Sequence, residues 1–459
     1  MADYRHTPEN TAGMPKGIPF ILGNELAERF SFYGMKAILT VYMTKHLLDA
    51  SGNPDVMSDE EAKSIYHLFT AAAYFFPILG SLLADILLGK YLTIIVLSLG
   101  YCFGHGFLAL GDTGAGAALL SPREWLFLGL AFIAVGAGGI KPCVSAHLGD
   151  QFGKSNSHLI SKVFSWWYFS INVGAATSTL LTPVLLENVG PWAAFGLPGI
   201  LMALATLTFW LGRNRFVHIQ PSGLEHFKRE SLSPDGLRAL VNLIPLFLIF
   251  VPMFWAIFDQ TGSAWVLQAE DMDRVFLGRE WLESQIQAAN PILILILIPT
   301  FTYVIYPFMG RFFEPTPLRR IGIGLFMTAG AFAITGALQA SIDAGGTPNI
   351  GWQLLAYVIL TSAEVLVSIT TLEFAYTQAP KKMKSFIMGI YFLGVSLGNL
   401  VTSGVNKLMQ GDDPLLVLDG ADYYWFFTNA MIVTAVVYLF FARTYKGRTY
   451  VQDEELEAS

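Results

Sequence analysis

The chain has 459 residues, of which 53% are hydrophobic and only 14% are charged, and its mean hydropathy is +0.50. Because soluble domains carry about 25% charged residues, this composition excludes an ordinary soluble protein and favours a membrane protein with many spans surrounded by lipid. The net charge of −7 gives no sign of a nucleic-acid partner, since the excess acid lies in a few loops and the tail.

Runs of about 20 apolar residues, each long enough to cross a bilayer as a helix, recur along the chain. No cleavable signal precedes them, because the first 16 residues are polar and the first apolar run is too long and too charged. The twelve predicted spans are 18–45, 63–88, 91–111, 124–145, 161–186, 192–211, 238–266, 288–310, 318–340, 352–377, 386–408 and 422–442.

Lysine and arginine predict the orientation of these spans, because they concentrate in cytoplasmic loops. They cluster in alternate connections, at 212–237, 311–320, 380–385 and 443–459. The other connections are acidic or neutral, at 49–62, 268–287, 341–351 and 409–421. We therefore expect a multi-pass protein of the plasma (inner) membrane with both termini in the cytoplasm.

The longest polar connection after the sixth span divides the chain into two sets of six. We expect an N-terminal bundle in residues 1–211, a cytoplasmic linker in 212–237, and a C-terminal bundle with a short tail in 238–459. This layout is that of the major facilitator superfamily, an all-α fold of twelve membrane helices in two bundles around a central site. The repeat rests on layout alone, because the two halves show no clear sequence similarity.

The first span carries an unusual set of charges, Glu25, Glu28, Arg29 and Lys36, on one helical stripe that also includes Tyr33. Ionisable groups inside a membrane are costly, so they normally face a polar cavity and mark an ion or substrate path. The alternative is that they only neutralise one another, but a single Glu–Arg pair would do that.

Charges in the other spans follow the same logic. In a facilitator fold the first, fourth, seventh and tenth spans line the central cavity. Here each of these spans carries at least one charged residue, whereas the peripheral spans carry almost no buried charge. The cations Arg29 and Lys141 come from the first half, and the acids Asp259 and Glu364 from the second. Such opposite walls would orient a zwitterion, with its carboxylate toward the cations and its ammonium toward Glu364.

His67 is the one histidine that we place deep in a span, where it is either a satisfied hydrogen-bonding group or a proton carrier. Cys102 and Cys143 lie in apolar runs and are expected to act as small hydrophobic residues. The segment 136–141 lacks the spacing of a phosphate-binding loop, and no metal-ligand or nucleophile–base pattern occurs. We therefore expect neither an enzyme nor a cofactor.

Two motifs carry a resemblance to a known family. Glu25-Leu-Ala-Glu28-Arg29-Phe30, followed by Tyr33-Gly34, matches the E-x-x-E-R-F-x-x-Y-G motif of the proton-dependent oligopeptide transporters. The segment 167–174 resembles their F-Y-x-x-I-N-x-G-S-L signature, although Trp167 replaces Phe and two alanines follow in place of Ser-Leu. Other stretches, such as 254–260 and 364–380, are similar to the intestinal and renal peptide transporters of mammals.

This resemblance implies a proton-coupled symporter that imports di- and tripeptides by alternating access. It implies that Arg29 and Lys141 lie near the peptide carboxylate and that Asn172, Asn290 and Glu364 lie near the amino end. It places four aromatic residues around the peptide side chains: Tyr33, Tyr74, Tyr168 and Trp255. It assigns proton coupling to Glu25, Glu28 and His67.

The chain departs from the family in two connections. Only about ten residues, 341–351, stand where the mammalian proteins have a large extracellular insert, and 212–237 is too short for the two extra helices of many bacterial members. Two other functions remain open: a family member that carries another solute, such as nitrate, and a non-transporting receptor.

The pair Lys36 and Asp259 is predicted to form a gate. Lys36 lies seven residues beyond Arg29, about 10.5 Å along the helix, and Asp259 lies in the outer half of the seventh span. In a facilitator fold these helices face each other across the outer mouth of the cavity. We expect a salt bridge that forms when the protein opens inward; the alternative is that Lys36 extends to the lipid headgroups.

Overall fold

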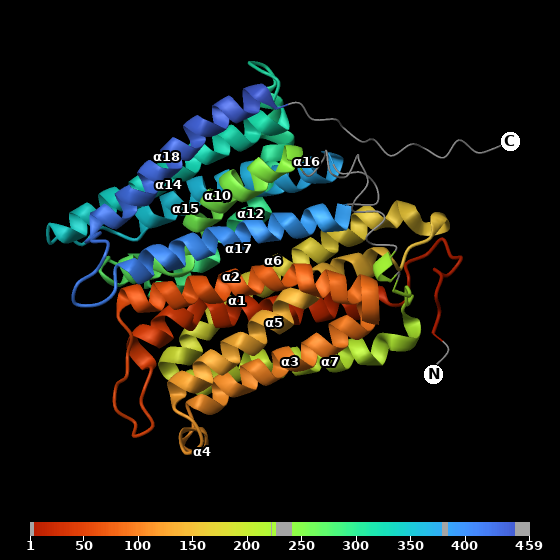
Figure 1. Cartoon of the computed structure of the whole chain (residues 1–459), viewed down its shortest axis with the longest axis horizontal. Coiled ribbons are helices and arrows are strands. Elements are labelled where there is room, and N and C mark those ends of the chain that lie inside the picture. Colours follow the sequence, from red (N-terminus) through yellow and green to blue (C-terminus); the bar gives the residue numbers. More distant parts are fainter. Residues whose placement is uncertain (1–3, 222, 226–240, 379–383, 446–459) are drawn as a thin grey trace.

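The computed structural model describes residues 4–221, 223–225, 241–378 and 384–445, and nearly all of its regular structure is helical (Figure 1). In this part of the chain, ten helical segments are long and apolar enough to cross a membrane. Together with α1 and α17 they correspond to the twelve predicted spans. Helix α1 is not among these ten segments, because its charged stretch, 25–36, interrupts the apolar run.

The first half consists of helices joined by short turns. The long helices are α1 (Ile18–Val41), α2 (Asp59–Leu83), α3 (Lys90–Gly111), α5 (Pro122–Gly149), α6 (Ile160–Asn188) and α7 (Pro191–Leu211). Short helical segments flank them: η1 (Tyr42–His46), η2 (Ala84–Leu88), α4 (Gly114–Ala117), η3 (Lys154–Leu159) and η4 (Gly212–Arg215). Serine caps begin two of the long helices, since the Ser58 and Ser121 hydroxyls accept hydrogen bonds from backbone N–H groups that lack helical partners.

The second half repeats this pattern with more interruptions. Its longer helices are α12 (Ala289–Thr300), α14 (Pro317–Asp343), α15 (Gly351–Glu364), α17 (Lys384–Leu408) and α18 (Ala421–Thr444). Its shorter helical segments are η5 (Leu246–Phe250), α10 (Val251–Phe258), η6 (Asp259–Gly262), α11 (Ala264–Glu270), η7 (Glu283–Ala288), η8 (Phe301–Ile305), α13 (Tyr306–Met309), η9 (Val365–Ile369) and α16 (Thr370–Gln378). Strands β1 (Val275–Phe276) and β2 (Arg279–Glu280) form a small antiparallel hairpin.

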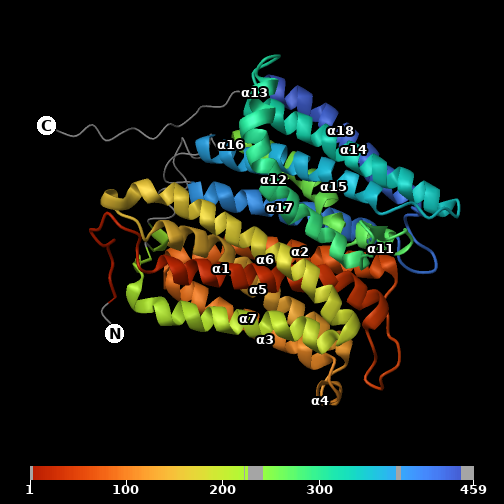
Figure 2. The ribbon, with the colours of Figure 1, turned by 180° about the vertical axis from the view of Figure 1, so that it is seen from behind.

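Two hydrophobic cores divide the helices into two groups. One core draws its buried residues from 18–216 apart from Val266, and the other draws them from 243–438. Figure 1 shows the first group below the second, with α17 running along α2 at the boundary, and Figure 2 shows α6 and α12 on the opposite face. Residues 222 and 226–237 of the predicted linker lie outside the described residues.

Small residues allow the close helix contacts on which this packing depends. A Cβ on Gly80 of α2 would lie 2.4 Å from the Cα of Gly139 in α5, so these two helices touch backbone to backbone. A Cβ on Gly262 would lie 1.8 Å from the Tyr66 hydroxyl oxygen, across the boundary between the two groups. A larger residue at Gly80 or Gly262 would force the helices apart.

We call the side on which α1 begins and α18 ends the terminal side, and the side that holds residues 47–58 the loop side (Figure 1). On the terminal side, the N-terminal segment packs on the residues that follow α7. The Tyr4 ring stacks on the His218 ring with centroids 4.1 Å apart, and the His218 backbone N–H donates to the Arg5 carbonyl at 2.8 Å. Burial lowers the pKa of the His218 imidazole, whose Nε2 lies 2.7 Å from the Arg213 carbonyl oxygen.

Candidate functional site

The charged stretch of α1 forms a buried cluster. The Arg29 Nε donates to Glu25 Oε1 at 2.7 Å and lies 2.8 Å from Glu28 Oε2. All three side chains are buried, with Arg29 7% exposed and Glu28 fully enclosed. Within the described part of the chain, neither oxygen of Glu28 has a hydrogen-bond partner, and no hydrogen bond uses the terminal nitrogens of Arg29. The guanidinium therefore keeps donors that could bind a second carboxylate.

Lys141 of α5 adds a second cation to the same bundle. Its Nζ lies 3.7 Å from the ring centroid of Phe32 and 4.4 Å from that of Tyr74. The ammonium is buried, and among the described residues it has no hydrogen-bond partner. A buried ammonium held only by aromatic faces is incompletely compensated, so an anion beside it would be stabilised.

Glu364 supplies the negative charge on the other bundle. The Asn290 amide of α12 donates to Glu364 Oε2 at 2.7 Å and to the Thr361 hydroxyl at 3.2 Å. This bond holds the carboxylate at the end of α15, where a π-helical turn begins. No cation among the described residues forms an ion pair with it. Asn290 and Glu364 were both predicted to lie near the amino end of the peptide, and the structure joins them by a hydrogen bond.

The predicted aromatic residues lie on both bundles. The rings of Tyr74 (α2) and Trp255 (α10) have centroids 6.4 Å apart, across the boundary. Tyr33 lies one helical turn beyond Arg29 on α1. Tyr168 of α6 packs against a small apolar cluster of the second bundle that contains Ile294 and Val365. Tyr74, Trp255 and Tyr168 therefore lie at or near the boundary between the two bundles.

Asn172, which is predicted to lie near the amino end of the peptide, has a hydrogen-bond partner in its own helix. Its amide donates to the Tyr168 carbonyl of its own helix at 2.9 Å, and the side chain is 6% exposed. The structure thus gives Asn172 an intrahelical bond but no bond to Asn290 or Glu364.

A second buried network lies further along α1 and joins the two bundles. The Lys36 Nζ lies 2.7 Å from Asp259 Oδ1, and the Asn399 amide donates to the other Asp259 oxygen at 2.8 Å. His67 lies 2.7 Å from Asn399 Oδ1 through Nδ1 and 2.9 Å from Ser263 Oγ through Nε2. The predicted Lys36–Asp259 ion pair is present, and Lys36 is only 6% exposed, so it does not extend to the headgroups.

More bonds between the bundles follow on the loop side of Lys36. The Thr40 hydroxyl donates to the Gly262 carbonyl at 2.8 Å, and the Gln287 amide donates to the Ala37 carbonyl at 3.0 Å. Lys45 lies 2.8 Å from Glu283 and 3.1 Å from Glu270. These contacts close the loop side of the boundary over the described residues.

Two buried polar residues were not predicted from the sequence. Asn399 links Asp259 to His67, but it shares the apolar run of the eleventh span with Asn406, and nothing in the sequence singled it out. His67 is also not the one deeply placed histidine, which corrects that prediction. His105 of α3 is fully buried and stacks on Tyr101 with ring centroids 5.1 Å apart, because α3 packs closely on α7 there.

Comparisons with known proteins identify the family to which this fold belongs. Residues 91–231 and 223–425 match the family model described as the POT family. The chain belongs to the POT family. It is 36% identical over 368 residues to "Peptide transporter family 1" of Drosophila melanogaster, covering 72% of this chain and 48% of that relative. It is also 36% identical over 397 residues to human "Solute carrier family 15 member 2", covering 78% and 53%.

A solved structure extends the match over the whole fold. The crystal structure of an auto-inhibited POT family peptide transporter superposes with a TM-score of 0.86, at 35% identity, over 96% of this chain and 99% of the other. The chain spans about half the length of the two sequence relatives. The POT family protein described here is thus an all-α, multi-pass membrane protein of the major facilitator type, as predicted, and its relatives are named as transporters.

Proposed function

We propose that this POT family protein is a proton-coupled symporter that imports di- and tripeptides by alternating access. One observation carries the proposal. Unpaired donors of Arg29 and Lys141 on one bundle, and the Glu364 carboxylate on the other, provide opposite charges for the two ends of a zwitterion. The names of the relatives, which are peptide transporters, support the same substrate class.

In this proposal the peptide carboxylate binds Arg29 and Lys141. The peptide ammonium binds Glu364, whose position Asn290 fixes, and the Asn172 amide oxygen accepts a further hydrogen bond from the amino end. The backbone of a di- or tripeptide thereby spans the boundary between the bundles. Side chains of many kinds then contact the aromatic residues Tyr33, Tyr74, Tyr168 and Trp255, which provide apolar surface with few directional demands.

Proton coupling follows from the competition for Arg29. When a peptide carboxylate takes up donors of Arg29, the attraction between the guanidinium and Glu28 weakens, and the buried carboxylate can accept a proton. Glu25 supports the cluster, and it provides a second acceptor. His67 couples to the gate, because it is hydrogen-bonded to Asn399, which also holds Asp259.

The closed loop side defines the state and the orientation that we propose. With the termini in the cytoplasm of a plasma (inner) membrane protein, the Lys36–Asp259 pair and the bonds around Thr40 and Lys45 seal the external mouth. The bundles formed by residues 1–211 and 238–459, joined by a cytoplasmic linker at 212–237, would separate on the loop side when the protein opens outward. The Lys36–Asp259 salt bridge must break for that motion.

Uptake into proteoliposomes tests the proposal. The purified protein should accumulate a radiolabelled dipeptide against its gradient when the outside is acidic, and a proton ionophore should abolish the accumulation. Unlabelled tripeptide should compete, whereas free amino acids and nitrate should not. Proton-driven uptake of nitrate instead of peptide would indicate another solute, and peptide binding without any uptake would indicate a receptor.

A further inference from the structure

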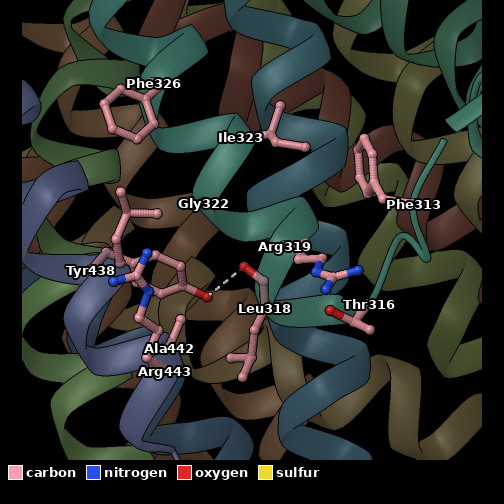
Figure 3. A pocket seen from close by; sticks show the side chains of 11 residues that line it. Phe313, Thr316, Leu318, Arg319, Gly322, Ile323, Phe326, Tyr438, Ala442 and Arg443 are labelled. Atoms are coloured by element: carbon pink, nitrogen blue, oxygen red, sulfur yellow. Dashed lines mark hydrogen bonds between the residues drawn. The ribbon is translucent and has the colours of Figure 1, made fainter.

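A groove lies on the outer face of the second bundle, at the terminal side, where α14 begins and α18 ends (Figure 3). Its volume is about 570 Å³, and it lies away from the charges described above. The lining residues come from these two helices and from the turn before α14: Phe313, Thr316, Leu318, Arg319, Gly322, Ile323, Phe326, Tyr438, Leu439, Ala442 and Arg443.

One end of the groove is cationic. Arg319 stands in the first turn of α14 and Arg443 in the last turn of α18, and both side chains are exposed. Arg319 donates one hydrogen bond, to the Glu314 carbonyl at 2.9 Å, which leaves most of its N–H groups unused by the described residues. Neither guanidinium has a carboxylate partner within ion-pair distance in the described part of the chain. In a protein of net charge −7, this end of the groove is locally positive.

The other end of the groove is apolar and open. Phe326 lies seven residues beyond Arg319, about 10.5 Å deeper along the helix. The Phe326 side chain is 40% exposed, and Leu439 on the facing helix is 43% exposed. Figure 3 shows Phe326 and Ile323 at the end away from Arg319 and Thr316. The groove therefore changes from polar to apolar along the direction in which a lipid changes from headgroup to chain.

The floor between these ends is fixed. The Tyr438 hydroxyl donates to the Leu318 carbonyl at 2.9 Å (Figure 3). Gly322 allows this approach, because a Cβ there would lie 3.2 Å from the Tyr438 ring. Buried tyrosine and glycine thus hold α14 and α18 in one arrangement, and the groove is a preformed feature of the fold.

We propose that this groove binds one anionic glycerophospholipid from the leaflet on the terminal side. Its phosphate pairs with Arg319 and Arg443, and the first segment of an acyl chain lies along Ile323, Phe326 and Leu439. Basic pockets between membrane helices recognise anionic headgroups in this way. The volume fits a headgroup with its glycerol, because small-molecule sites occupy roughly 300–1,000 Å³. The apolar end favours a lipid over free phosphate, which could use only the arginines.

Native mass spectrometry of the purified full-length protein tests the proposal. The protein, in detergent, is titrated with phosphatidylglycerol or phosphatidylcholine of identical acyl chains, and separately with glycerol 3-phosphate. We expect one tightly retained phosphatidylglycerol, weaker phosphatidylcholine, and no retained glycerol 3-phosphate. Equal retention of the two lipids, or retention of glycerol 3-phosphate alone, would overturn the proposal. So would a protein dimer in place of bound lipid, since a second copy would then cover the groove.

Two kinds of variant locate the site. The double variant Arg319→Gln/Arg443→Gln should retain phosphatidylglycerol about tenfold less, whereas Arg213→Gln/Arg311→Gln, with the same charge change on the same side outside the groove, should match the wild type. Leu439→Trp keeps both arginines but fills the apolar end, and it should also release the lipid. Thermal melting confirms that each variant is folded. Unchanged retention in either groove variant would contradict the assignment.

Discussion

Helix α1 carries two buried charge clusters about two turns apart, and the protein satisfies them to different degrees. In the cluster around Lys36, the ammonium has a carboxylate at 2.7 Å, and Asn399 satisfies the other carboxylate oxygen. In the cluster around Arg29, both Glu28 oxygens and the nearby Lys141 ammonium have no hydrogen-bond partner among the described residues. In the first cluster, both carboxylate oxygens have partners within the protein. In the second cluster, hydrogen-bond donors and acceptors remain without partners among the described residues.

The difference indicates different roles. A buried ion pair in which both carboxylate oxygens have hydrogen-bond partners is well compensated, and here it joins one bundle to the other. Buried charges without full compensation are costly and persist where a ligand or a proton completes them. The complete cluster therefore fits a gate and the incomplete cluster fits a binding site. Three predictions test this contrast, beginning with the largest expected effect, and a fourth concerns the terminal side.

Glu28→Gln should abolish proton-driven accumulation of peptide while peptide counterflow continues. The amide cannot take up and release a proton, but it preserves the shape of the Arg29 cluster. Both activities are measured in proteoliposomes with a labelled dipeptide. Glu61→Gln is a matched control, because Glu61 pairs with Arg123 at 2.8 Å on the loop side.

Accumulation in each of Glu25→Gln, Glu28→Gln and His67→Gln would show that the coupling site lies elsewhere. Glu364 would then be the next candidate. Loss of counterflow together with accumulation in Glu28→Gln would instead indicate damage to the binding site.

Glu364→Gln should weaken binding of peptides with a free amino group far more than binding of amino-blocked analogues. Removing one partner of a desolvated charge pair costs about 2–5 kcal/mol, or about 30-fold or more in affinity. Competition against a labelled dipeptide measures both ligands. An equal loss for both would argue against an ammonium contact at Glu364.

Reversing the gate pair should impair transport, and reversing both members should restore part of it. Lys36→Asp and Asp259→Lys each place two like charges together, whereas the double variant re-forms an ion pair in the opposite sense. A bias of 1.4 kcal/mol between the two states changes their ratio about tenfold, so we expect changes of that order in uptake rate. A double variant as poor as the sum of the single variants would remove the gate from the mechanism.

The smallest expected effect is a change in hydrogen exchange of the N-terminal segment, on the terminal side and away from both clusters. The pKa of His218 is lower in the folded protein than in a free chain, so the neutral imidazole is the form that the packing favours. The stability that neutral His218 contributes to this packing is present above the pKa of about 6.5 in the unfolded chain, and it is lost as the pH falls below that value. Amides 5–13 should therefore exchange hydrogen faster at low pH than their intrinsic rates explain.

His218→Phe supplies the control for this measurement. Phenylalanine retains a ring to stack on Tyr4 and does not titrate, so the excess exchange at low pH should disappear. His6→Gln in the background removes the neighbouring imidazole, which lies 2.8 Å from the His218 carbonyl oxygen. If the pH dependence survived in the double variant, His218 would not be its source.

The spans were predictable from the sequence because the bilayer imposes one length and one polarity on every crossing helix. The predicted runs correspond to the helices of the structure, including α1, in which charges interrupt the apolar pattern. Breaks within spans were less predictable. No local pattern marked the π-helical turn that follows Glu364.

The candidate site was predictable as a set of residues, because each ionisable group inside an apolar run signals a special environment. Arg29, Lys141, Asp259 and Glu364 all stood out for this reason. Their partners were harder to find. Neutral groups such as Asn399 cost less to bury than charges do and are common in membrane helices, so sequence alone gave Asn399 no weight.

The sequence by itself determined that this protein crosses the membrane many times and which charges lie inside it, because burying a charge is costly wherever the helix is placed. Tertiary structure decided which charges are compensated. Glu28 and Asp259 are both acids in apolar runs with a cation nearby, yet only Asp259 acquires a full set of partners. Those partners come from α1 and α17, residues far apart in sequence, and only the packing of one bundle against the other brings them together.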